Sequence, residues 1–395
     1  NRKRWALSLL LAVLIMPGIK PFTAAAEENQ AEETTLESIT EPVTETDQTE
    51  GLDSEAIKEE DHSTQENTET PQTEAGSVTA TVGGISRTVS LKVAPREVVT
   101  YADYADWSAV GAAQTEAGLK SSGALAGSGT AEDPWKIGKP EALAWFASKV
   151  NAGEMAAGNQ NILLTADINL CGDGFGGSVD APLNWIAITQ LSGTFDGGNH
   201  TIDYLRGNQA LINVVANGTI QNVTIGANGI LSGSKCAGIA VAPSGTVIIT
   251  NCINRANITG SFRAGGIIAS GEVGNTQVFI SKCGNEGTIT ITGGIGSGIV
   301  GYFSSASMVY YAGIITDCYN KGSIVNRSGD LAGCGGISNA FGEDRQRISN
   351  CYNVGSMSGN RLAAIVPGGR GMTSNCFSRS GNGGGLRNGV TALTQ

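Results

Sequence analysis

The stretch Ile249-Thr250-Asn251-Cys252-Ile253-Asn254 is the first of four copies of one pattern in the second half of the chain. The other copies read ISKCGN at 280–285, ITDCYN at 315–320 and ISNCYN at 348–353, and a weaker one reads NCF at 375–377. Consecutive cysteines of the series lie 31, 35, 33 and 25 residues apart. A period in this range is typical of repeat proteins in which each unit stacks on its neighbours.

Each unit contains three short segments with the composition of β-strands. An Ile-x-x-Cys segment comes first, and the turn after it has Asn two residues after the Cys and, in most units, Gly four residues after it. A segment of small residues, such as AGGI at 264–267, completes the unit. Three strands in about 30 residues fit one turn of a right-handed parallel β-helix, an all-β fold. Leucine is too scarce for a leucine-rich solenoid, and a propeller requires longer and more regular blades.

A capping helix is expected near the start of this repeat domain, which is predicted to span residues 126–395. Pro140 suits the first position of a helix. An apolar stripe at helical spacing follows at Leu143, Phe146, Ala147 and Val150. A helix laid across the end of a β-stack covers unpaired strand edges and the apolar interior.

Three segments are predicted before the repeat domain. Residues 1–26 have a basic start, an apolar stretch and small residues up to Ala26, which is the pattern of a signal peptide cleaved after Ala26. Residues 27–76 contain 17 Asp or Glu and one Lys, so they bury too little apolar surface to fold and are expected to be a disordered acidic linker. Residues 77–125 are expected to form a short β segment, one hairpin in length, followed by a linker.

The acidic linker accounts for the net charge of −11, and the rest of the chain is close to neutral. No basic face suggests nucleic acid as a partner. No segment after the signal is apolar for long enough to span a membrane. The mature chain is therefore expected to be secreted or on the cell surface, as a monomer.

The Gly-Gly-Ile segments at 264–267 and 333–337 and the Asn-Cys-Tyr-Asn-x-Gly turns resemble the GLUG-motif repeats of secreted bacterial surface proteins. The lead-in GSGT at 127–130 and the stretch FDGGNHTI at 195–202 resemble the cap and first coils of the same group. The resemblance covers about residues 127–395. It implies a right-handed parallel β-helix with a role in adhesion or scaffolding, and it implies no common catalytic residues.

The recurrent cysteines are predicted to be free thiols that stack inside the coil, at Cys252, Cys283, Cys318 and Cys351. The preceding unit has Val223 at the same position, so the slot accepts a small apolar side chain. Stacked strands lie about 4.8 Å apart, whereas a disulfide requires Cβ atoms about 3.8 Å apart. Cys236 and Cys334 are expected in one register on strands three steps apart, too far to bond. No CxxC pair or His accompanies these residues, so neither a metal site nor a cofactor is expected.

Two further columns are predicted. Stacked asparagines are expected to hydrogen-bond along the domain at Asn254, Asn285, Asn320 and Asn353. Aromatic residues follow the inward cysteines and are expected to point outward at Tyr319, Tyr352 and Phe377. Such a row can stack on sugar rings or shield the backbone of the turn, and both readings stay open. The insertion from Tyr302-Phe303 to Tyr310-Tyr311 is a second candidate for exposed aromatic residues.

The predicted fold is compatible with catalysis, because parallel β-helices host polysaccharide lyases and hydrolases. These reactions need clustered carboxylates around Ca²⁺ or a carboxylate pair at a set separation. The acidic residues of the repeats are scattered, and Asp167, Asp173, Asp180 and Asp196 lie in turn contexts, so no catalytic residue is assigned. The predicted function is a non-catalytic binding or adhesion module for a carbohydrate or another cell-surface ligand. A passive stalk and a polysaccharide lyase or hydrolase are the alternatives.

Overall fold

The structure, a computed structural model, describes residues 75–82, 85–92, 103–271, 276–303, 312–329, 333–339, 347–367, 372–379, 381 and 390–393. The expected signal peptide at 1–26, with its cleavage site at Ala26, lies outside the described residues. So does the expected acidic linker, apart from its last two residues. The chain divides into two compact units, Asn1–Pro95 and Arg96–Gln395.

The first unit contains two paired strands. Strand β1 (Ala75–Val82) pairs antiparallel with β2 (Ile85–Lys92), and Val82 lies opposite Ile85. Strand β1 begins at Ala75, one residue before the expected end of the acidic linker at residue 76. Alternating apolar and polar residues along both strands are typical of such a pair.

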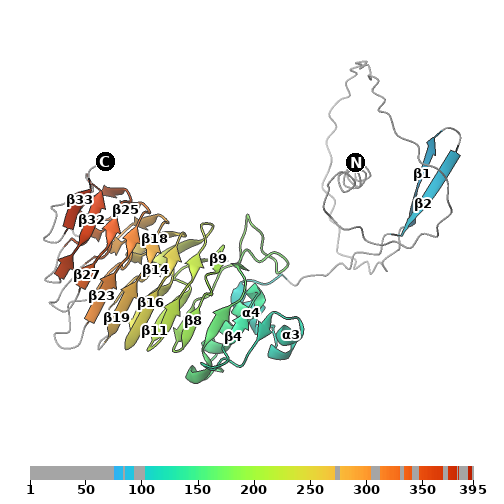
Figure 1. Cartoon of the computed structure of the whole chain (residues 1–395), viewed down its shortest axis with the longest axis horizontal. Coiled ribbons are helices and arrows are strands. Elements are labelled where there is room, and N and C mark those ends of the chain that lie inside the picture. Colours follow the sequence, from blue (N-terminus) through green and yellow to red (C-terminus); the bar gives the residue numbers. More distant parts are fainter. Residues whose placement is uncertain are drawn as a thin grey trace, which may run out of the picture. The chain divides into compact units, whose positions relative to one another are not determined.

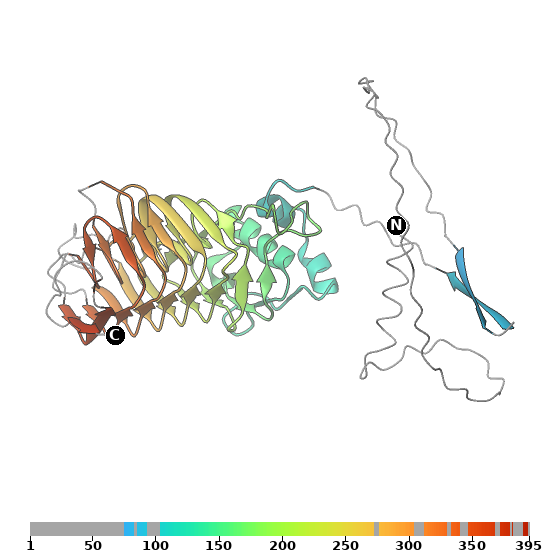
Figure 2. The same cartoon turned by 90° about the horizontal axis from the view of Figure 1, so that it is seen from above.

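Most of the second unit consists of short strands in long parallel sheets (Figures 1 and 2). Sheet I contains β3 (Leu125–Ala126), β4 (Trp135–Ile137), β5 (Ile162–Leu164), β8 (Thr194–Asp196), β12 (Thr219–Gln221), β16 (Thr246–Thr250), β19 (Gln277–Ser281), β23 (Ala312–Thr316), β27 (Arg347–Ser349) and β31 (Met372–Ser374). Sheet II contains β6 (Ile168–Asn169), β9 (Thr201–Asp203), β13 (Thr224–Ile225), β17 (Ile253–Asn254), β20 (Gly284–Asn285), β24 (Tyr319–Asn320), β28 (Tyr352–Asn353), β32 (Cys376–Arg379) and β33 (Val390–Leu393).

Two more sheets lie in the described part of this unit. Sheet III contains β10 (Arg206–Gly207), β14 (Ile230–Ala237), β18 (Asn257–Gly265), β21 (Ile289–Ile291), β22 (Ile295–Ser297), β25 (Ile324–Asn326), β26 (Cys334–Gly335), β29 (Met357–Gly359) and β30 (Leu362–Ala363). Sheet IV contains β7 (Ile188–Leu191), β11 (Ile212–Ala216) and β15 (Ala240–Ser244). Among the described strands of this unit, the β3–β4 pair is antiparallel and the other neighbours are parallel.

The chain visits sheets I, II and III in turn and then returns to sheet I beside the strand it has just left. Strands β16, β17 and β18 are followed in this way by β19, which pairs with β16. We call one such round a pass. Equivalent residues of successive passes therefore align in columns, and the isoleucines of one fully buried column in sheet I are Ile220, Ile249, Ile280, Ile315 and Ile348.

Sharp corners between sheets I and II require a left-handed residue in each pass. The residue before the column of Val223 and the cysteines has φ between 49° and 56° at Asn222, Asn251, Lys282, Asp317, Asn350 and Asn375. Asparagine and aspartate tolerate this conformation better than other non-glycine residues, which accounts for their use here.

The small residues of the third segment are needed because two parts of each pass approach closely. A Cβ atom at Gly298 would overlap the carbonyl oxygen of Gly336 and would lie 2.7 Å from the Cβ of Asn320. Gly266 stands in the same relation to Gly298 and Asn285. The Gly-Gly-Ile pattern is therefore the steric counterpart of the asparagine column on the facing strand.

Helices lie at the β4 end of the sheets (Figure 1). They are α2 (Trp107–Ala112), α3 (Glu116–Ser121) and α4 (Pro140–Asn151), with a 3₁₀ turn, η1, at Ala157–Asn159. Helix α4 begins at Pro140 as predicted, and its apolar stripe is buried beside α2 and β7. The described chain is thus strand-rich with parallel sheets, and its helical end makes the purely all-β description too narrow.

Residues 107–125, which were predicted to lie outside the repeat domain, pack into the same core as the sheets. Trp107 and Leu119 are almost fully buried, and the Trp107 indole N–H donates to the carbonyl of Leu170 at 2.9 Å. A Cβ atom at Gly111 would overlap the Ala144 carbonyl oxygen of α4. The Gly- and Ala-rich composition of this segment therefore serves close helix packing, although it suggested a linker.

Candidate functional site

The aromatic row expected to face outward makes contacts within the protein. Tyr319, Tyr352 and Phe377 are in register on neighbouring strands of sheet II and are all half-buried. The rings of Tyr319 and Tyr352 stack with centroids 5.4 Å apart and planes at 11°. The ring of Tyr319 lies over Gly284 of the previous pass, where a Cβ atom would overlap it. These contacts favour the reading that the row shields the turn backbone.

A column of alternating charge runs beside these rings. Arg255, Glu286 and Lys321 each follow an asparagine of the predicted ladder, so they occupy equivalent positions in three passes. The Glu286 carboxylate lies 2.9 Å from Arg255 Nε and 3.7 Å from Lys321 Nζ, and it accepts a 2.9 Å hydrogen bond from the Tyr319 hydroxyl. The hydrogen bond from Arg255 is the main cause that holds the pKa of Glu286 below its usual range. Burial, followed by the bond to Glu286, raises the pKa of Tyr319.

The second aromatic candidate is only partly described, and Tyr310 lies outside the described residues. Tyr302 is half-buried, and the Arg263 guanidinium lies 4.0 Å from the centre of its ring. Phe303 was expected to be exposed, but it is fully buried in the core. A Cβ atom at Gly271 would overlap its ring and one at Gly313 would lie 3.3 Å from it, so these glycines leave the room that Phe303 fills.

The cysteines form a dry column beside the isoleucines. The Cys283 N–H lies 3.4 Å from Cys318 Sγ, and the Cys318 N–H lies 3.4 Å from Cys351 Sγ. Cys236 aligns through Ala264 and Gly296 with Cys334, three strands away, as predicted. Burial raises the pKa of Cys236 and of Cys334 to about 12, and it also raises the pKa of Cys283. The free and buried thiols are Cys171, Cys236, Cys252, Cys283, Cys318, Cys334, Cys351 and Cys376.

The four ladder asparagines are fully buried and lie in register. The side-chain amide of each of the first three donates to the side-chain oxygen of the next at 2.8 Å, from Asn254 through Asn285 and Asn320 to Asn353. The preceding pass has Ile225 at this position, which cannot donate, so the Asn254 side-chain oxygen has no hydrogen-bond partner within the part of the chain that the structure describes. Ser378 follows Asn353 in the column. The ladder is a structural element of the interior and is closed to ligands.

A second amide ladder, which the sequence reading missed, runs along the surface at the left-handed corners. Asn251 donates to Asn222 at 2.9 Å, and Asn375 donates to Asn350 at 2.8 Å. Lys282 interrupts this column between its two halves. The sequence contains a pattern that predicts this ladder, because Asn or Asp precedes the repeat cysteine in all copies but one.

The carboxylates near the start of the sheets are occupied by turn hydrogen bonds. Asp196 accepts from the backbone of Gly198 at 2.9 Å and from the side chain of Gln221 at 2.7 Å. Asp167 accepts from the backbone of Thr201 at 2.8 Å, which is the main cause that lowers its pKa. Within the described residues, no three His, Cys, Asp or Glu side chains converge as a potential metal site.

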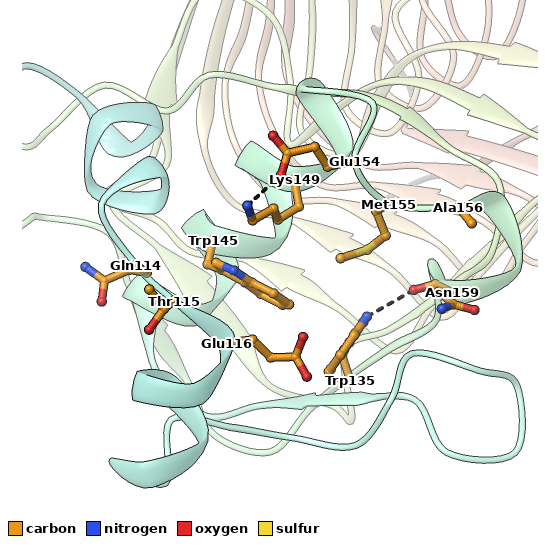
Figure 3. Close-up of a pocket in the computed structure, with 10 residues that line it drawn as sticks. All are labelled: Gln114, Thr115, Glu116, Trp135, Trp145, Lys149, Glu154, Met155, Ala156 and Asn159. Carbon is orange, nitrogen blue, oxygen red and sulfur yellow. Dashed lines mark hydrogen bonds and ion pairs between the residues drawn. The ribbon is translucent and has the colours of Figure 1, made fainter.

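A pocket of about 520 Å³ lies in the helical end of the second unit (Figure 3). The residues that line it are Gln114, Thr115, Glu116, Trp135, Trp145, Lys149, Glu154, Met155, Ala156 and Asn159. The two indole rings meet edge to face, with centroids 5.3 Å apart and planes at 84°. The pocket thus combines a rigid aromatic wall with charged and amide groups.

The polar groups of the pocket differ in whether they have an ion-pair or hydrogen-bond partner. Glu116 pairs with Lys120 at 2.8 Å, and Glu154 pairs with Lys149 at 2.6 Å. The indole N–H of Trp145 is buried and has no acceptor among the described residues. An unsatisfied buried donor of this kind costs about 1–3 kcal/mol.

The chain was compared with family models, curated proteins and solved structures, and none of them matches it significantly. None of the helices in the described part of the chain has the length and apolar character to cross a bilayer.

Proposed function

We propose that this chain is an exported surface protein whose folded part is a right-handed parallel β-helix, and that it acts as a non-catalytic binding module for glycans. The β-helix is supported by the strand order, in which successive passes from β8 to β30 add one parallel strand to each of sheets I and II and one or two to sheet III. Export and surface exposure are supported by the signal-peptide pattern at residues 1–26 and by the resemblance to GLUG-motif repeats.

Binding is favoured over catalysis by the way in which the stacked passes use their polar groups. The carboxylates at the turns accept backbone and amide hydrogen bonds, and the alternating charges beside Tyr319 neutralise one another. A ligand therefore has to bind where dissimilar side chains converge around open space. The observation that carries the proposal is the pocket at the helical end, whose volume of about 520 Å³ lies in the range of ligand sites.

The proposal is tested with the full chain on a glycan array, in parallel with incubations on polysaccharides in the presence of Ca²⁺. We expect saturable binding to a subset of glycans and no release of unsaturated sugar or new reducing ends. Accumulation of either product would replace the binding module by a lyase or a hydrolase. An array without any hit would favour the passive stalk.

Location and assembly are tested separately. Expression in a bacterial host should deliver the protein outside the cytoplasm with Glu27 as its first residue, because cleavage is expected after Ala26. Light scattering should give the mass of a monomer. A chain that retains residues 1–26 in the cytoplasmic fraction would contradict export.

A further inference from the structure

Eight free thiols are unusual in a chain with an expected signal peptide, because cysteines form disulfides in the oxidising surroundings that exported proteins meet. We propose that the second unit folds only while its thiols are reduced, and that disulfides formed in the unfolded chain keep it from folding. Once folded, the stack protects the same thiols from oxidants. This redox dependence goes beyond glycan binding and does not depend on the identity of any ligand.

The thiols of the main cysteine column occupy equivalent and anchored positions. Each Sγ lies 3.1–3.3 Å from the backbone carbonyl oxygen two residues earlier, to which the thiol donates. The members of this column are Cys252, Cys283, Cys318, Cys351 and Cys376. Val223 fills the same slot in an earlier pass, as the pairing of Thr224 with Ile253 shows. The thiols therefore act as small interior side chains with a fixed direction.

Neighbouring thiols of the column cannot bond without disturbing the stack. Their strands lie about 4.8 Å apart, whereas a disulfide requires Cβ atoms about 3.8 Å apart. The backbone at these positions is held by the sheet, since the Cys283 carbonyl accepts from the Tyr319 N–H and the Cys318 carbonyl from the Tyr352 N–H, both at 3.0 Å. A disulfide between neighbours would therefore strain the ladder that holds successive passes together.

The folded stack shields its thiols from oxidants. All eight are buried, and those of the main column are 0% exposed. Burial also raises the pKa of Cys236 and of Cys334 to about 12, and it raises the pKa of Cys283. Because the thiolate is the form that attacks a disulfide, these thiols react only after the stack opens.

The unfolded chain has no such protection, because its thiols are accessible and have a pKa of about 8.5. With glutathione disulfide as the oxidant, one cysteine thiolate displaces one glutathione thiolate from it, and a second cysteine thiolate then displaces the other. Two protein thiols are oxidised to a disulfide, and one glutathione disulfide is reduced to two glutathione thiols, which take up the two protons. A chain cross-linked in this way cannot place both cysteines in their slots.

The experiment refolds the full chain from urea, with far-UV circular dichroism and tryptophan fluorescence as measures of the native state. One sample stays in dithiothreitol, and a second is oxidised in urea with glutathione disulfide until Ellman's reagent detects no thiols. After dilution of the urea, we expect the reduced sample to regain its native signals and the oxidised sample to lose most of them. Dithiothreitol added to the oxidised sample should restore them, which separates a disulfide block from irreversible damage.

A third sample is the native protein incubated with the same oxidant for the same time. It should keep its native signals, and mass spectrometry should find neither disulfides nor glutathione adducts. Loss of structure in this sample would contradict the protection of the thiols by the stack. Recovery of the native signals by the oxidised sample, with its disulfides intact, would overturn the proposal.

The matched control replaces the five cysteines of the main column by valine, the residue found at position 223. This variant retains Cys171, Cys236 and Cys334. After the same oxidation it should regain a larger share of its native dichroism than the parent chain does, and an equal loss would overturn the role of the column. The three samples of the parent chain decide the redox dependence even if this variant does not fold.

The outcomes are separable from those of the proposed function. A chain that binds no glycan on the array but refolds only when reduced would end the binding module and leave the redox dependence standing. A chain that binds glycans and refolds equally well when oxidised would do the reverse.

Discussion

Replacing Asn320 by Ala should destabilise the stack more than the same change at Asn254, the first residue of the interior ladder. Its side-chain amide donates to the Gly322 carbonyl at 2.9 Å and to Asn353 at 2.8 Å, and its oxygen accepts from Asn285 at 2.8 Å. Each buried hydrogen bond contributes about 1 kcal/mol net. Three lost bonds and a small cavity predict a loss of about 3–5 kcal/mol in the free energy of unfolding.

Asn254→Ala is the matched comparison at the start of the ladder. It also removes two donated hydrogen bonds, to the Ala256 carbonyl at 3.0 Å and to Asn285 at 2.8 Å. It deletes in addition a buried oxygen that has no partner, which offsets part of the cost. We therefore expect a loss of about 1–2 kcal/mol.

The assay is urea denaturation followed by two probes. Apart from Trp5 in the expected signal peptide, all tryptophans lie between Trp107 and Trp185, so their fluorescence reports the helical end and the first passes, while far-UV circular dichroism reports all the strands. Stacked repeats interact mainly with their nearest neighbours, so Asn320→Ala should shift the dichroism transition more than the fluorescence transition. Equal losses for Asn320→Ala and Asn254→Ala, or a loss below about 1 kcal/mol for Asn320→Ala, would refute the reasoning.

Four further predictions follow from the same contacts. Gly298→Ala should lower the free energy of unfolding by about 1–3 kcal/mol through overpacking, whereas Gly329→Ala, at a position with open space, should be neutral in the same urea denaturation. Lys282→Asn should raise stability by about 0.5–1 kcal/mol, because Asn fits the left-handed corner and continues the surface ladder. Ellman's reagent should detect none of the eight thiols in the native protein and all of them in denaturant, and rapid native labelling would contradict their burial. The pKa of Glu286 is lowered in the folded state, so its contribution to stability is complete above the ordinary glutamate pKa of about 4.3 and is lost as the pH falls below it. When the pH is lowered through this range, the free energy of unfolding of Glu286→Gln should therefore fall less than that of the parent, by a difference of less than about 1 kcal/mol.

The columns of the stack can be predicted from the sequence, because stacking imposes one register on all copies of the repeat. Once the cysteines are aligned, the partners of Cys236 and of the ladder asparagines follow by counting, and the strand pairing places Cys334 three strands from Cys236. The helix at Pro140 is also accessible, since its spacing and its first residue are local signals.

Other features depend on contacts between segments that no local pattern connects. Helix α2 is hidden by its Gly- and Ala-rich composition, and the reason for that composition, the contact of Gly111 with Ala144, appears only in three dimensions. Phe303 is buried because two distant glycines leave room for its ring. The pocket escapes prediction for the same reason, since its lining comes from α3, β4, α4 and the residues that follow α4.

The position of the pocket follows from the physics of stacking. In the repeats, each side chain lies about 4.8 Å from its equivalents in the neighbouring passes, and like charges at that distance repel. The column of Arg255, Glu286 and Lys321 avoids this by alternating its sign, and the asparagine and cysteine columns avoid it by using amides and thiols. The helical end has no such period, so unlike groups such as Trp145 and Glu116 can converge there around one space. A variant that opens a comparable pocket within the passes should therefore lose stability, whereas changes to the lining of the existing pocket should alter binding first.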